Sequence, residues 1–141
     1  MNLDLEELYQ QVILDHGKSP RNFGEVYDNS YSCFEGQFPS CAEKIKICIN
    51  KDGDLIKDIA WTATGSMLLM ASGSIVSSKL KTLNIMEGKR WIDHVYNCFI
   101  NKEEPSYEYT GEIMCLLRVT NFPRRLKSVL LPIHAMRENL K

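Results

Sequence analysis

The chain has 141 residues, of which 44% are hydrophobic and 25% are charged, a composition typical of a folded domain and not of a disordered chain. Seventeen basic and eighteen acidic side chains give a formal net charge of −1. Without an excess of positive charge, neither nucleic acid nor a membrane surface is expected as a partner. The length suits a single domain over residues 1–141.

The first half of the chain predicts one helix followed by strands. Apolar residues at helical spacing predict a helix over 5–17, where turn-forming residues follow. A weak alternation suggests an edge strand over 27–34, and a clean one predicts a strand over 43–50 with three isoleucines on its buried face. A glycine suited to a hairpin turn lies within 51–54, and 59–63 alternate as the returning strand. These segments predict a small antiparallel sheet.

The second half of the chain predicts helices. Residues 66–80 are rich in small side chains and predict a helix that packs closely on the sheet, and 90–100 predict a second one. A polar linker is expected over 102–109, a short helix over 112–119, and a last helix from Pro123, because proline suits the first helical position. The order of elements predicts an α+β fold: about three antiparallel strands packed against an N-terminal helix and several C-terminal helices.

One uncharged run of twenty residues, 59–78, has about the length of a membrane-spanning helix. Nine of these residues are Ser, Thr or Gly, and Gly65 interrupts the run. We therefore interpret it as a buried strand that passes into a buried helix.

The five cysteines are an odd number without CxxC spacing, so no disulfide framework is expected. The N-terminal residues lack the pattern of a signal peptide, which favours the reducing cytoplasm. Cys41 lies in a predicted loop, and loops carry functional residues more often than cores do. The other four are interpreted as small buried residues: Cys33, Cys48, Cys98 and Cys115.

Four segments, taken together and in order, resemble the SufU/IscU/NifU N-terminal family of iron–sulfur cluster assembly proteins. They are VILDHGKSPRNFG at 12–24, FPSCAE at 38–43, TGSMLLMAS at 64–72 and NFPRRLKSVLLP at 121–132. The resemblance covers nearly the whole chain, and the long middle region together with Lys127 points to the SufU branch. His16, in the first segment, is interpreted as a structural partner and not as a ligand.

The resemblance also implies where a metal or cluster would be held. The family uses three cysteines and an aspartate from three separate loops. The matching positions here hold Cys41, Glu43 in place of the aspartate, and Ser66 and Ser128 in place of the other two cysteines. Ala42 replaces a glycine of the family motif, in a turn expected to need a positive φ.

The replaced thiols bear on the chemistry of this site. A thiolate is a soft ligand that binds zinc and iron–sulfur clusters, whereas a serine hydroxyl is hard and stays protonated near neutral pH. One thiol, one carboxylate and two hydroxyls are a poor set for zinc. We expect metal or cluster binding to be weakened or lost, and no tightly bound cofactor.

The function that the resemblance implies is iron–sulfur cluster assembly, as a scaffold or sulfur acceptor that acts with a cysteine desulfurase and other assembly factors. Cys41 is the expected persulfide acceptor, and no independent catalysis is expected. The basic residues Arg124, Arg125 and Lys127 are expected to contact the partner, since three charges are too few for a nucleic-acid site.

Two other functions remain open. The protein could be a docking or regulatory module that binds a desulfurase without carrying metal or sulfur, in which case Cys41 is dispensable. It could also be an unrelated thiol enzyme with Cys41 as nucleophile, but this needs a nearby base, and no local motif pairs Cys41 with a histidine.

Overall fold

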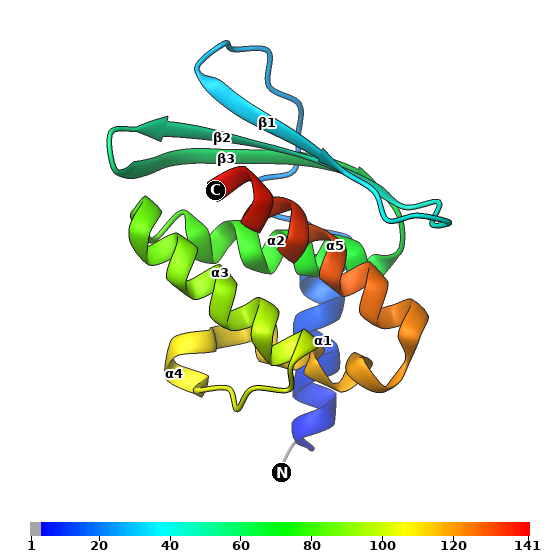
Figure 1. The fold of residues 1–141 in the computed structure, drawn as a ribbon. Helices are drawn as coiled ribbons and strands as arrows, with labels where there is room; N and C mark the ends of the chain where they lie inside the picture. The colour runs from blue at the N-terminus through cyan, green and yellow to red at the C-terminus, as the bar shows by residue number, and fades with distance from the viewer. Residues whose placement is uncertain (1–3) are drawn as a thin grey trace.

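The structure is a computed structural model that describes residues 4–141. Three strands and a set of helices follow one another along the chain, and Figure 1 shows the sheet lying across one side of the helices. The elements are α1 (Leu5–Lys18), β1 (Tyr31–Gly36), β2 (Lys44–Asp52), β3 (Leu55–Thr64), α2 (Met67–Leu80), α3 (Ile85–Ile100), α4 (Tyr107–Thr110), the 3-10 helix η1 (Gly111–Asn121) and α5 (Pro123–Leu140). The predicted α+β fold is confirmed.

The sheet is antiparallel in the order β1-β2-β3. Its central strand, β2, alternates as the sequence predicts, with Ile45, Ile47 and Ile49 buried on the face that meets the helices. The β2–β3 hairpin turns at Gly53, whose φ of 61° is the left-handed conformation that glycine adopts without strain. The edge strand lies a few residues later than the predicted 27–34, because its pairing with β2 begins at Tyr31.

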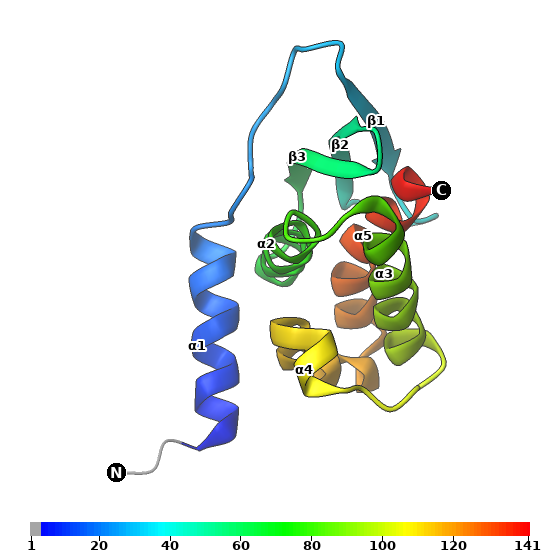
Figure 2. The ribbon, with the colours of Figure 1, turned by 90° about the vertical axis from the view of Figure 1, so that its left-hand side faces the viewer.

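Helices α2 and α5 pack directly beneath the sheet, and α2 lies between α1 and α5 (Figure 2). Small residues make this close packing possible, because a Cβ at Gly73 of α2 would lie 2.6 Å from the Trp61 ring of β3. The run 59–78 is thus the end of β3 followed by α2, as predicted. Among residues 4–141, no helix is long and apolar enough to cross a membrane.

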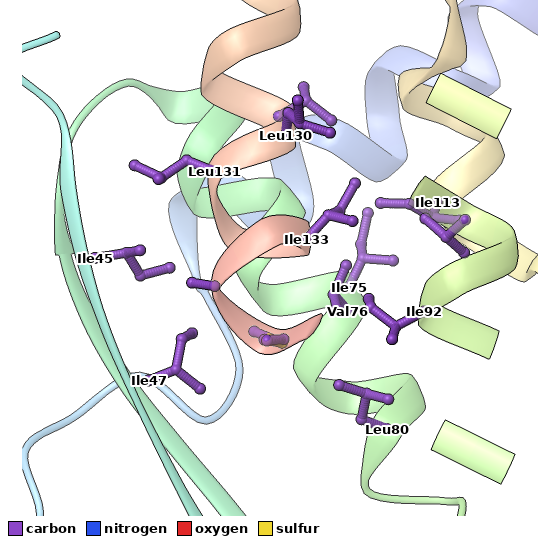
Figure 3. Close-up of a cluster of buried hydrophobic side chains, with 14 of the residues drawn as sticks. Ile45, Ile47, Ile75, Val76, Leu80, Ile92, Ile113, Leu130, Leu131 and Ile133 are labelled. Atoms are coloured by element: carbon purple, nitrogen blue, oxygen red, sulfur yellow. The ribbon is translucent and has the colours of Figure 1, made fainter. Parts of the chain in front are cut away.

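The hydrophobic core fills the space between the sheet and the helices. Figure 3 shows Ile45 and Ile47 of β2 facing the side chains of α5, with Ile75 and Val76 of α2 deeper in the cluster. Ile47 and Val76 are fully buried. This core packs β2, α2 and α5 against one another, and the candidate site lies where these three elements begin.

The structure corrects some of the local expectations. The predicted linker over 102–109 contains the start of α4. A helix is present where one was expected over 112–119, but it is the longer 3-10 helix η1, a distinction that hydrophobic periodicity does not make. Cys33 and Cys48 form a disulfide, although none was expected. Cys48 is buried as expected, but Cys33 is exposed. The odd cysteine count did not reveal this pair, because the pairing depends on the register of β1 against β2.

Candidate functional site

The loop over residues 37–43 joins β1 to β2 and carries Cys41. The backbone N–H of Cys41 donates to the Phe38 carbonyl at 3.2 Å, and the Gln37 amide donates to the Cys41 carbonyl at 2.9 Å. The positive φ of this turn, 61°, belongs to Ser40 and not to Ala42, so the strain expected at Ala42 is absent. The loop is therefore a folded turn that presents a half-buried, free Cys41 thiol.

Glu43, at the end of the same loop, connects two other segments of the chain. One carboxylate oxygen, Oε2, accepts the backbone N–H of Ser66 at 2.6 Å. The other, Oε1, accepts the Ser128 hydroxyl at 2.5 Å. The β1–β2 loop, the β3–α2 connection and the start of α5 converge on the right-hand side of Figure 1. We call these hydrogen bonds between Glu43, Ser66 and Ser128 the carboxylate bridge.

The first helix that the bridge touches is α2. Ser66 is its N-cap, and the Ser66 hydroxyl accepts the N–H of Leu69 at 3.3 Å. A carboxylate beside a helix N-terminus is stabilised by the unpaired N–H groups and the helix dipole. Gly65 makes room for it, since a Cβ there would lie 2.6 Å from Glu43 Oε2. Glu43 therefore completes the capping of α2.

The second helix is α5, through Ser128, whose side chain is largely buried. Its hydroxyl lies 2.5 Å from Glu43 Oε1 and 3.3 Å from the Arg124 carbonyl. A hydroxyl has one proton to donate, and the shorter, charge-assisted bond to Glu43 is the stronger of the two. Ser128 is thus engaged as a hydrogen-bond donor to Glu43.

The fold and this arrangement can be compared with known proteins. The sequence profile of the NifU-like N terminal domain matches residues 8–99, more than half of the chain. The chain belongs to this family.

Two relatives that align with nearly the whole chain are named as a sulfurtransferase and as a scaffold protein. The zinc-dependent sulfurtransferase SufU of Bacillus subtilis (strain 168) is 30% identical over 139 residues, which cover 99% of this chain and 93% of that protein. The iron–sulfur cluster assembly scaffold protein IscU of Streptococcus pyogenes serotype M1 is 28% identical, covering 97% and 85%. The crystal structure of FiSufU from Fervidobacterium islandicum AW-1 superposes with a TM-score of 0.84 over 98% of this chain and 100% of that one, at 24% identity, which supports the fold alone.

At the positions that the resemblance matches to the family's ligands, this chain has one thiol, one carboxylate and two hydroxyls. Both carboxylate oxygens of Glu43 already accept hydrogen bonds, one of them from Ser128. Among the residues that the structure describes, no three His, Cys, Asp or Glu side chains are grouped closely enough to hold a metal ion. The structure thus brings Glu43, Ser66 and Ser128 together as a hydrogen-bonded set and not as a set of soft ligands.

The basic residues of α5 lie next to the bridge. Arg124, Arg125 and Lys127 are exposed within the first two turns of α5, directly before Ser128. The Arg125 guanidinium stacks over the Phe122 ring at 4.9 Å. Phe122 itself is 53% exposed, so an apolar ring accompanies the three charges. The sequence predicted the three charges as a contact surface but not Phe122, because the exposure of this ring is known only from the structure.

The other two free thiols, Cys98 and Cys115, are buried. Burial, with the carboxylates of Glu103 and Glu104 nearby, raises the pKa of Cys98. Burial, with Glu112 nearby, raises the pKa of Cys115. A raised pKa keeps a thiol protonated and unreactive. Of the three free cysteines, Cys41 is the one that solvent reaches best.

His16 is a structural partner, as expected. It is 7% exposed, and its Nδ1 lies 2.7 Å from the Ser74 hydroxyl of α2. Its Nε2 lies 3.3 Å from the Glu112 carboxylate of η1. The imidazole therefore joins α1 to two other elements.

Proposed function

We propose that this protein is a sulfur acceptor in iron–sulfur cluster assembly, that Cys41 receives the sulfur, and that its partner is a cysteine desulfurase. Membership of the NifU-like family and the names of the SufU and IscU relatives support the process. The observation that carries the proposal is the free, half-buried Cys41 thiol on a folded turn, two residues before Glu43. We also place the protein in the cytoplasm, where this thiol stays reduced.

The transfer step needs one thiolate and no metal. The Cys41 thiolate attacks the terminal sulfur of a persulfide on the desulfurase cysteine. A new sulfur–sulfur bond forms at Cys41, the original one breaks, and the desulfurase cysteine leaves as a thiolate that takes up a proton. The number of disulfide-level bonds is unchanged, so no oxidant or reductant is consumed.

The metal-dependent form of this activity does not suit this chain. Glu43 is occupied by Ser66 and Ser128 through hydrogen bonds, and neither serine supplies a thiolate. We therefore propose that zinc and cluster binding at this position are lost, and that the carboxylate bridge holds the three segments together without a metal. Elemental analysis of the purified protein should find no stoichiometric zinc or iron, whereas the variant Ser66→Cys/Ser128→Cys should gain zinc.

A docking module is the second candidate, and the exposed face of α5 favours it. Arg124, Arg125, Lys127 and the Phe122 ring combine charge with an exposed apolar surface, as protein-binding sites do. The candidate predicts the same partner but no sulfur on Cys41. The two functions therefore differ in whether Cys41 carries a persulfide after incubation with the desulfurase.

The deciding experiment incubates the protein with a desulfurase and cysteine and measures persulfide on each cysteine by mass spectrometry. We expect one added sulfur on Cys41, none in Cys41→Ser, and an unchanged yield in the control Cys98→Ala, whose thiol is buried. A wild-type protein that binds the desulfurase but carries no sulfur would establish the docking module. Persulfide that persists in Cys41→Ser would refute the assignment of Cys41.

A further inference from the structure

Cys33 and Cys48 lie directly opposite each other on β1 and β2, with their Cα atoms 4.1 Å apart. They share the sheet face that points away from the helices, because the residues on either side of Cys48, Ile47 and Ile49, face the core. In the next strand the register places Ala60 beside Cys48, where a small side chain leaves room for the sulfur atoms. Both sulfur atoms are therefore placed for a bond across the two strands.

The pair encloses the loop that carries Cys41. Residues 37–43 lie between the two cysteines in the chain, so the bond closes a ring around this loop. Within the described sheet, β1 is an edge strand paired with β2 alone. Besides that pairing, β1 packs on α5 and has two further hydrogen bonds, from the Tyr31 hydroxyl to Asp58 and from the Asn139 amide to the Ser32 carbonyl. The Cys33–Cys48 bond is thus the one covalent tie at the base of the Cys41 loop.

We propose that Cys33 and Cys48 form a reversible redox couple that clamps the Cys41 loop when oxidised and releases it when reduced. The two thiols differ in access, because Cys33 is exposed and Cys48 is 3% exposed. Cys33 is the thiol that meets a reagent from solution, and Cys48 is the one that completes or leaves the protein disulfide.

The oxidant is a small-molecule disulfide, such as oxidised glutathione. The Cys33 thiolate attacks one sulfur of it, which forms a mixed disulfide and releases one small thiol. The Cys48 thiolate then attacks the Cys33 sulfur, which forms the protein disulfide and releases the second small thiol. The two protein thiols lose two protons and two electrons, and the oxidant gains both.

The consequence for the loop follows from the ring. With the bond closed, the open states of β1 and of the 37–43 loop are restricted by the covalent tie. With the bond open, β1 keeps its pairing with β2, its packing on α5 and two side-chain hydrogen bonds but loses its covalent tie, so local opening of this edge strand costs less free energy. In the reducing cytoplasm the open form dominates, and oxidative conditions close it. This clamp is independent of whether Cys41 accepts sulfur.

The redox step is tested by equilibrating the whole protein with mixtures of reduced and oxidised glutathione, quenching in acid and identifying alkylated cysteines by mass spectrometry. The quenched protein is unfolded before alkylation, so that buried thiols also react. We expect the alkylation of Cys33 and Cys48 to fall together as the mixture becomes more oxidising, and that of Cys98 and Cys115 to stay complete. If Cys33 and Cys48 both stay thiols in every mixture, or if either pairs with another cysteine, the redox couple is refuted.

The clamp is tested by hydrogen exchange of the peptide that spans 37–43. We expect exchange to be about three-fold or more faster in the reduced than in the oxidised protein, as for a local opening whose free energy is lowered. Cys33→Ser/Cys48→Ser should match the reduced form under both conditions, and the control Cys98→Ala should behave as wild type. Should the double variant fold poorly, Cys33→Ser alone keeps the buried Cys48 and gives the same comparison. Equal exchange in the two forms would refute the clamp even if the disulfide forms.

Discussion

The carboxylate bridge should contribute measurable stability, and a double-mutant cycle between Glu43 and Ser128 isolates that contribution. The bond between them is short, at 2.5 Å, and joins a hydroxyl donor to a carboxylate. Hydrogen bonds to charged groups contribute about 1.5–3 kcal/mol, and half-burial of Glu43 places this one near the lower end. We therefore expect Ser128→Ala to lower the free energy of unfolding by about 1.5 kcal/mol.

Glu43→Ala should cost more, because it also removes the carboxylate from the N-terminus of α2. That contact with the Ser66 N–H adds about 0.5–1 kcal/mol to the loss. Once Glu43 is gone, Ser128 has the weaker acceptor at 3.3 Å left, the Arg124 carbonyl. The double variant should therefore lose less than the two single variants combined, with a coupling free energy of about 1 kcal/mol.

Urea unfolding monitored by tryptophan fluorescence measures these values, since Trp61 and Trp91 are each 1% exposed and report on loss of the core. Ser77→Ala is the matched control. Its hydroxyl also donates to a backbone carbonyl, but Ser77 lies eleven residues beyond Ser66 along α2, or about 16 Å away. Its effect should add to that of Glu43→Ala without coupling. A coupling below about 0.3 kcal/mol between Glu43 and Ser128 would refute the bridge as a stabilising unit.

Two further substitutions test the packing and the charge of the sheet. Gly73→Ala should lower the free energy of unfolding by about 2 kcal/mol, because its Cβ meets the buried Trp61 ring at 2.6 Å; an unchanged thermal midpoint would contradict this. Burial acts to raise the pKa of Asp58, but hydrogen bonds from Tyr31 and Lys81 outweigh it and hold that pKa below its usual 3.8. The stabilisation is therefore present above about pH 4 and is lost as the pH falls through the lower folded-state pKa. Tyr31→Phe should cost about 1 kcal/mol at pH 7, and the difference from wild type should shrink below pH 4 in urea titrations; a constant difference would show that Asp58 is not involved.

Elements with a strong local pattern were predictable from the sequence. The three isoleucines of β2 alternate with polar residues, and the turn at Gly53 follows directly, so β2 was predicted within two residues of its observed bounds. The returning strand β3 begins at Leu55, four residues before the predicted 59. The start of α2 was predicted within one residue, because Gly65 and Ser66 are a breaker and an N-cap in succession. In contrast, β1 is only partly buried along its length and carries no clear alternation, so its position depends on pairing with β2.

The site was predictable as a set of positions but not as a set of contacts. The resemblance pointed to Glu43, Ser66 and Ser128, and the structure brings all three together. The resemblance could not predict that Glu43 accepts two hydrogen bonds, one of them from Ser128, 85 positions further along the chain. The Cys33–Cys48 pair was missed for the same reason, because long-range pairing is set by register and packing.

The two serines and the glutamate at the positions that the resemblance matches to the family's ligands form one connected set. The resemblance implies that an ion links three loops in the family through thiolates and a carboxylate. In this chain Glu43 links the corresponding three segments through the Ser66 N–H and the Ser128 hydroxyl. The additional methylene of glutamate lengthens its reach, and each carboxylate oxygen accepts one of these two hydrogen bonds. Under the proposed loss of metal binding, these hydrogen bonds hold the three segments together, and the free Cys41 takes no part in them.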